Sequence, residues 1–148
     1  MRTMWDAARA DDIRERVARL TPACTRQWGR MSPQQMVCHL SESLKMALGD
    51  LQVAPKPMPI RYPPLKQVIV YLAPFPKNAP TAPELTIGAT PRPWANDVTS
   101  LQTLIDRFTA RLPEAKWPDH PAFGRLSRRA WGALAYRHMD HHLRQFGV

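Results

Sequence analysis

The stretch YRHMDHHLRQFG, residues 136–147, carries three of the five histidines of the chain and decides how the remaining sequence is interpreted. Its apolar positions recur at helical spacing, and a helix turns about 100° per residue. His138 and His142 therefore lie one turn apart, about 40° from each other on the same face. His141 is about 100° from His142 and points away from that face. We predict that two of these imidazoles, and not the third, converge on one point inside the protein.

Two histidines four residues apart on a helix are the arrangement with which zinc proteases bind their metal. The pair alone is also typical of buried, hydrogen-bonded histidines, and an open metal site needs at least three protein ligands. His39, in the middle of QMVCHLSES (residues 35–43), is the best third ligand. His120 lies on a connector before a proline and is a weaker candidate. Cys38 lies about 100° from His39 on its helix, and we interpret it as a buried, unreactive thiol.

Four segments have the periodicity of amphipathic helices, each with one apolar stripe. The sharpest boundaries belong to the segment that contains His39. Ser32 is a good N-cap, Pro33 suits the first turn, and Gly49 ends the helix after Leu48. The other expected helices are residues 5–20, 97–112 and 127–146. Four such helices bury their stripes most simply as a four-helix bundle, so the sequence predicts an all-α fold.

The middle of the chain interrupts this pattern, because eleven of the sixteen prolines fall between Pro55 and Pro93. Proline cannot continue a helix, and it biases the preceding residue toward extended conformations. Residues 64–75, PLKQVIVYLAPF, are the one part of this region with a long enough run between prolines to form a regular element. Their apolar spacing favours a short buried helix, with a strand as the alternative. We expect residues 76–96 to be irregular. A connection this long in a small domain is usually functional or a packed cover.

Length and composition limit the class of protein. A chain of 148 residues is the size of one domain, so residues 1–148 are expected to form a single helical domain. The two cysteines make no disulfide framework, no apolar run suits a membrane helix, and the first residues lack an apolar signal core. The sequence therefore predicts a cytoplasmic protein. The net charge of +9 would favour binding to nucleic acid. The arginines are scattered along the sequence rather than clustered in one basic patch, which disfavours nucleic acid as a partner.

Three pieces of the sequence resemble one group of proteins. They are WGRMSPQQMVCHL (28–40), HPAFGRLSRRAWGAL (120–134) and YRHMDHHLRQFG (136–147). The spacing H-x-x-x-H-x-x-Q at 138–145, with an earlier histidine, is similar to the DinB/YfiT-like superfamily of bacterial four-helix-bundle metalloproteins, and in particular to a DinB-like family of uncharacterised function. This resemblance implies that His39, His138 and His142 bind a divalent metal. It also implies an up-down-down-up bundle with a long crossover after the second helix, and a homodimer.

These residues suggest a function. Three neutral imidazoles would leave one coordination position of a bound ion open. We expect the ion to be Zn²⁺, with Ni²⁺ or Fe²⁺ as alternatives. An ion in such a site activates a bound water or thiol. The resemblance implies a thiol-dependent transferase or isomerase that acts on a small molecule, and the open metal position also suits a hydrolase. We expect a metal-dependent transferase or hydrolase whose substrate is a small molecule, such as an anionic thiol. Arg137 and Arg144 would attract such an anion. Glu42 and Gln145 stand at the right spacing to be hydrogen-bond partners of the ligating imidazoles.

Two other interpretations stay open at this point. The chain can be a non-enzymatic module that binds nucleic acid or a protein partner through its basic surface. Alternatively, the metal can be purely structural, although three ligands leave the coordination sphere open and argue against that role. The sequence does not indicate which substrate the protein would use.

Overall fold

The computed structural model describes residues 1–56, 58–77 and 92–148, and these residues form helices and no β-strand. The long helices are α1 (Ala7–Ala18), α2 (Pro33–Leu48), α4 (Trp94–Thr109) and α5 (Arg128–Gln145). The short elements are a 3₁₀ turn η1 (Pro59–Arg61), a helical turn α3 (Leu65–Gln67) and a π-helical turn η2 (Val68–Leu72). The predicted all-α class is confirmed. None of the described helices has the length and apolar character to cross a bilayer.

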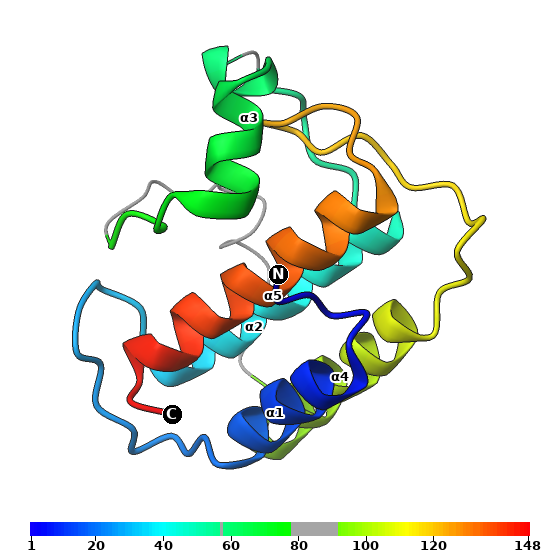
Figure 1. The fold of residues 1–148 in the computed structure, drawn as a ribbon. Coiled ribbons are helices and arrows are strands. Elements are labelled where there is room, and N and C mark those ends of the chain that lie inside the picture. The colour runs from blue at the N-terminus through cyan, green and yellow to red at the C-terminus, as the bar shows by residue number, and fades with distance from the viewer. Residues whose placement is uncertain (57, 78–91) are drawn as a thin grey trace.

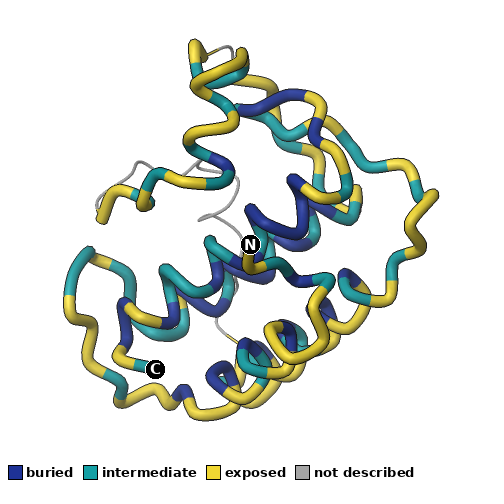
Figure 2. Tube along the Cα trace, viewed as in Figure 1, coloured by how far each residue is buried: buried dark blue, intermediate teal, exposed yellow. Residues whose placement is uncertain are grey.

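The four long helices share one core. α2 lies beside α5, and α1 lies beside α4 (Figure 1). α2 also packs on α4, and α1 packs on α5, so each long helix contacts two of the others. Their inner sides are buried and their outer sides are exposed (Figure 2). Ile13, Leu101, Phe108 and Leu143 have no exposed surface, and burial of such side chains stabilises helices that would be marginal alone.

The helix that carries His39 has firm ends, as the sequence predicts. The Ser32 hydroxyl accepts a hydrogen bond from Gln35 N (3.1 Å), and the Gln35 side-chain oxygen accepts one from Ser32 N (2.8 Å). Gly49 ends the helix with φ of 89°, a left-handed conformation that glycine adopts without steric strain. These two caps fix the register of α2 and so the direction of His39.

The predicted boundaries of α1 and α4 are wrong by two or three residues. α1 begins only at Ala7, because the Asp6 carboxylate caps it by accepting a hydrogen bond from Ala8 N (3.1 Å). α4 begins at Trp94 rather than at 97, and Trp94 packs against the core, which favours the extra residues. α4 ends before Leu112, which is 62% exposed and precedes a proline that disfavours helical conformation.

The segment of residues 65–72 is helical, but the prediction that it is buried is wrong. Val70 is 1% exposed, whereas Leu65, Val68 and Leu72 are 42%, 41% and 76% exposed. This helix lies outside the group of long helices, and η2 contacts α5 (Figure 1). The long helices complete the core by themselves, so the short helix buries only one side. The expectation that residues 76–96 are irregular is wrong at residues 94–96, which belong to α4. Residues 78–91 of this segment lie outside the described residues.

The residues before α1 hold α5 in place. Met4 N donates to the Gly132 carbonyl (3.1 Å), and the Trp5 indole Nε1 donates to the Arg128 carbonyl (2.9 Å). A Cβ atom at position 132 would lie 2.1 Å from Trp5 Nε1, so this close approach requires glycine in the middle of the helix. Trp5 also stacks on Phe108 with ring centroids 5.0 Å apart. The residues before α1 therefore anchor α5 to α4.

A tight turn leads into α5. The backbones of His120 and Gly124 form a mutual pair of hydrogen bonds (2.9 and 2.7 Å). Inside the turn, His120 Nδ1 accepts hydrogen bonds from Ala122 N (3.1 Å) and Phe123 N (3.3 Å). The imidazole packs on Trp131 with ring centroids 5.4 Å apart, and burial lowers the pKa of His120 to about 4. His120 is therefore a neutral, structural histidine.

We predict that His120→Asn makes the metal-free protein less sensitive to acid. Folded His120 has a pKa of about 4, below the 6.5 of an ordinary histidine, so the unfolded chain binds more protons between these values. The free energy of unfolding therefore falls as the pH drops through this window. Asparagine keeps an acceptor for the turn but does not titrate.

Urea denaturation at about pH 7 and about pH 4.5 measures the effect. The loss of unfolding free energy between the two conditions should be about 2 kcal/mol smaller in the variant than in the wild type. Equal losses in the two proteins would contradict the assignment of His120 as a buried neutral group.

Candidate metal centre

Three histidines meet where α2 lies beside α5. His39 comes from the middle of α2, and His138 and His142 come from successive turns of α5. His39 Nε2 is 3.0 Å from His138 Nε2, and the nitrogens that the three residues offer lie within 4.8 Å of one another. Two nitrogens bound to one tetrahedral zinc ion at about 2.0–2.1 Å are about 3.3 Å apart. The cluster therefore has the composition and nearly the spacing of a three-histidine metal site.

Burial keeps the two imidazoles of α5 neutral. Burial lowers the pKa of His138 well below its ordinary value, and His142 and His39 lower it further by charge repulsion. Burial, followed by repulsion from His39, lowers the pKa of His142 to about 4. Neutral imidazole is the form that binds metals, because protonation occupies the lone pair. His138 and His142 are therefore neutral at neutral pH, the form that a metal ion requires.

Gln145 fixes the tautomer of His142. The Gln145 amide nitrogen donates to the Trp28 carbonyl (2.8 Å), so its amide oxygen faces His142 Nδ1 at 2.9 Å. An amide oxygen can only accept, so His142 must donate from Nδ1. The lone pair of His142 then lies on Nε2. Such a partner on the far nitrogen is the usual way in which proteins orient a metal-binding histidine.

The loop before α2 holds Gln145 in turn. Gln145 is 3% exposed, and its backbone carbonyl accepts a hydrogen bond from Gln27 N (2.8 Å). Gly29 has φ of 78°, and a Cβ atom there would lie 2.4 Å from Gln145 Nε2. Spacing on the helix predicts Gln145, but the loop residues carry no periodic signal. Trp28 and Gly29 were therefore missed, although WG opens one of the recognisable sequence pieces.

The other candidate residues lie outside the cluster. His141 packs its ring near Trp28 and Phe75, with centroids 5.8 and 5.9 Å away, and is absent from the group of converging nitrogens. His120 belongs to the turn described above. Glu42 pairs with Lys45 at 2.8 Å. The expectation that His141 points aside agrees with these contacts.

Cys38 and Asp97 form a separate buried contact. Asp97 is 1% exposed and accepts hydrogen bonds from Gln34 (2.9 Å) and Arg92 (3.0 Å). Cys38 Sγ lies 3.7 Å from the same carboxylate, and burial, assisted by the charge of Asp97, raises the pKa of this thiol to about 11. Cys38 is therefore a protonated thiol at neutral pH, which agrees with its interpretation as unreactive. Asp97 was missed because a single acid at the start of a helix is ordinary.

The two arginines that flank the site are already engaged. Arg137 donates to the carbonyls of Ile69 (2.8 Å) and Ala73, and its guanidinium lies over the Phe75 ring, 5.2 Å from the centroid. Arg144 pairs with Asp140 at 3.1 Å. The expectation that these side chains attract an anionic substrate is therefore weakened. Arg137 instead ties the end of η2 to the helix that carries the histidines.

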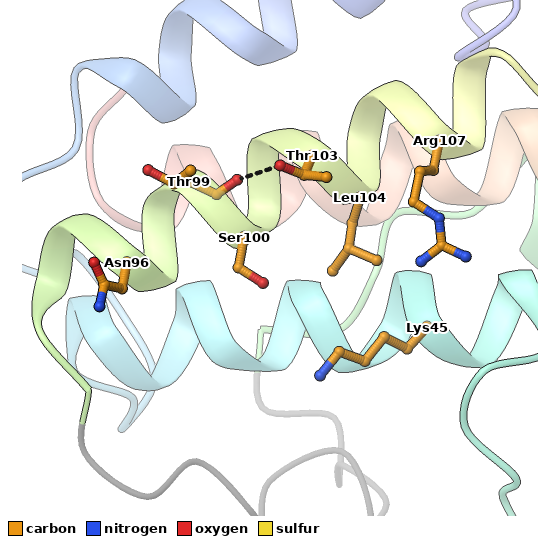
Figure 3. A pocket seen from close by; sticks show the side chains of 7 residues that line it. All are labelled: Lys45, Asn96, Thr99, Ser100, Thr103, Leu104 and Arg107. Atoms are coloured by element: carbon orange, nitrogen blue, oxygen red, sulfur yellow. Dashed lines mark hydrogen bonds between the residues drawn. The ribbon is translucent and has the colours of Figure 1, made fainter.

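A surface groove of about 460 Å³ lies on another side of the molecule, between α2 and α4 (Figure 3). Its lining residues are Lys45, Asn96, Thr99, Ser100, Thr103, Leu104 and Arg107. Lys45 pairs with Glu42 (2.8 Å) and Arg107 pairs with Asp50 (2.7 Å), so both cations of the groove are neutralised. Thr103 donates to the Thr99 carbonyl (3.0 Å), as Figure 3 shows. The groove includes none of the clustered histidines.

In a comparison with protein families, residues 4–147 match a family described as a protein of unknown function (DUF1569). The chain belongs to this family. No curated protein and no solved structure matches the chain. The family description assigns no activity, so the function must be inferred from the site itself.

We predict that Gln145→Leu releases the tautomer of His142. In the wild-type, metal-free protein, ¹⁵N NMR should detect His142 as a single tautomer protonated at Nδ1, because only that tautomer can donate to Gln145. Leucine preserves bulk but cannot accept, so the Nε2-protonated tautomer should become populated. The control is Gln102→Leu, which removes a comparable hydrogen bond to the Arg14 carbonyl (2.9 Å) on another face. An Nδ1 tautomer that survives in Gln145→Leu would contradict this role.

Proposed function

We propose that this chain is a divalent-metal protein that uses His39, His138 and His142 as ligands. The observation that supports the proposal most directly is the convergence of three imidazoles from two helices, one of them oriented by Gln145. Neutral nitrogen ligands suit Zn²⁺ best in this proposal, and Ni²⁺ or Fe²⁺ remain chemically compatible. The set contains no carboxylate from the described residues, so the oxygen-seeking ions Mg²⁺ and Ca²⁺ are poor fits.

We further propose that the protein is an enzyme rather than a structural metal protein. Three protein ligands leave at least one coordination position for a small molecule, and a bound ion lowers the pKa of a water or thiol at that position. The residues of the chain have supporting roles: His142 is oriented by Gln145, and Arg137 holds the η2 end near the cluster. The reaction class that fits is transfer or hydrolysis of a small molecule such as an anionic thiol.

The architecture that we propose is a DinB-like four-helix bundle in the up-down-down-up order. Its support is that each long helix contacts two of the others around one core. The connection from Gly49 to about Pro63 would begin the crossover between α2 and α4. The three-histidine cluster between α2 and α5 agrees with the ligand set that the resemblance implies.

We predict that protein purified without an affinity tag, and then dialysed against zinc, carries about one ion per chain by elemental analysis. His138→Ala should lose most of the metal, because two imidazoles cannot hold the ion against the buffer. His141→Ala is the matched control, since it removes a neighbouring imidazole that is not part of the cluster. It should retain the wild-type stoichiometry.

Two other outcomes of the metal analysis would contradict the proposal. Folded wild-type protein that takes up neither Zn²⁺, Ni²⁺ nor Fe²⁺ would overturn the proposal. Equal loss of metal in His138→Ala and His141→Ala would show that the ion binds elsewhere. The circular dichroism spectrum of each variant establishes that the helices are retained.

A further inference from the structure

Beside the histidine cluster stands a second group of side chains, Trp28, Phe75 and Lys77, which we call the aromatic-lysine wall. The Phe75 ring lies edge-on to His138 and His141, with centroids 6.2 and 5.9 Å away. Trp28 lies 5.8 Å from His141 by the same measure. Lys77 places its ammonium over the Trp28 ring, 4.7 Å from the centroid. The wall therefore consists of two aromatic rings and one cation, in which Phe75 contacts the proposed ligand His138 and Trp28 contacts the neighbouring His141.

Lys77 differs from the other cations near the site. Within the described residues its ammonium makes no ion pair and lies only against the Trp28 ring, and its side chain is exposed. Arg137 and Arg144 are occupied by backbone carbonyls and by Asp140, as described above. Lys77 is thus a cation beside Trp28 that can pair with an incoming anion.

The wall holds a second group that favours an anion. The indole Nε1 of Trp28 is buried, and no described residue accepts a hydrogen bond from it. A buried donor without an acceptor is unfavourable by roughly 1–3 kcal/mol, so most such groups in proteins find a partner. An anionic oxygen can accept from an indole N–H as well as pair with an ammonium.

The electrostatics of the proposed metal site act in the same direction. Three neutral imidazoles leave the full charge of a divalent ion uncompensated, because no carboxylate belongs to the described ligand set. The nearest carboxylate on α5, Asp140, is already paired with Arg16 (2.8 Å) and Arg144 (3.1 Å). The site and the wall together therefore present positive charge and two aromatic faces to a ligand.

We propose that this wall is the substrate-recognition surface of the metal site, and that it selects small carboxylic acids with a flat apolar or aromatic part. Lys77 and the Trp28 indole N–H recognise the carboxylate, and the rings of Phe75 and Trp28 contact the apolar part. This inference rests on the metal site proposed above. It names a substrate class and assigns specificity to residues that lie outside the histidine motif.

Isothermal titration of zinc-loaded protein with benzoate tests the inference. Wild-type protein should bind one benzoate, and Lys77→Met should weaken this binding about tenfold, the effect of one nearby charge in a partly solvated site. Lys116→Met is the matched control, because it removes another exposed lysine, on the connector after α4. It should leave the affinity unchanged. Benzamide, which has the same ring but no charge, should bind more weakly than benzoate to wild-type protein.

A second variant separates the two halves of the wall. Phe75→Leu should reduce the preference for benzoate over acetate, because it removes ring contact without changing charge. Zinc binding at one ion per chain without benzoate binding would overturn the inference and leave the metal site intact. Equal benzoate affinities in wild type and Lys77→Met would also overturn it. Failure to bind zinc would overturn the metal site and the inference together.

Discussion

The contact between α2 and α5 is the constraint on which the rest of the molecule depends. It places His39 Nε2 3.0 Å from His138 Nε2 and brings His142 beside both, in surroundings that keep His138 and His142 neutral. Burying three imidazoles together is unfavourable unless each nitrogen finds a partner, because buried polar groups lose their hydrogen bonds to water. A metal ion would satisfy the converging nitrogens at once. The proposed metal site would therefore account for the grouping of three histidines between α2 and α5.

Several features of the fold serve this contact. The capping box and Gly49 fix α2, and the packing of Trp5 against Gly132 fixes α5. Gln145 then connects the end of α5 to the loop before α2 through the Trp28 carbonyl. The same residue orients His142, so the support of the helix and the orientation of the ligand depend on one buried amide. Trp28 in turn joins the wall that faces the cluster, which links the site to its surface.

The helical period predicts much of this arrangement, and the exceptions have physical causes. The pair His138 and His142 follows from a spacing of four on one helix, and His39 from its place beside an apolar stripe. The wall was beyond prediction, because Trp28, Phe75 and Lys77 lie in non-periodic segments that meet only through tertiary packing. The burial of Asp97 was missed because a single acid in the first turn of a helix is ordinary. Exposure of residues 65–72 was mispredicted because apolar spacing cannot say whether the core is already full.

X-ray absorption at the zinc edge of the zinc-loaded protein tests the central claim most directly, because it counts and identifies the ligand atoms. The account predicts three imidazole nitrogens at about 2.0–2.1 Å and one further light atom, with no sulfur. His39→Ala, which leaves two imidazoles of the set, should lose most of its zinc and with it most of the absorption signal. A sulfur atom at about 2.3 Å, which would implicate Cys24 or Cys38, or a shell of oxygens without imidazole, would contradict a site built by His39, His138 and His142.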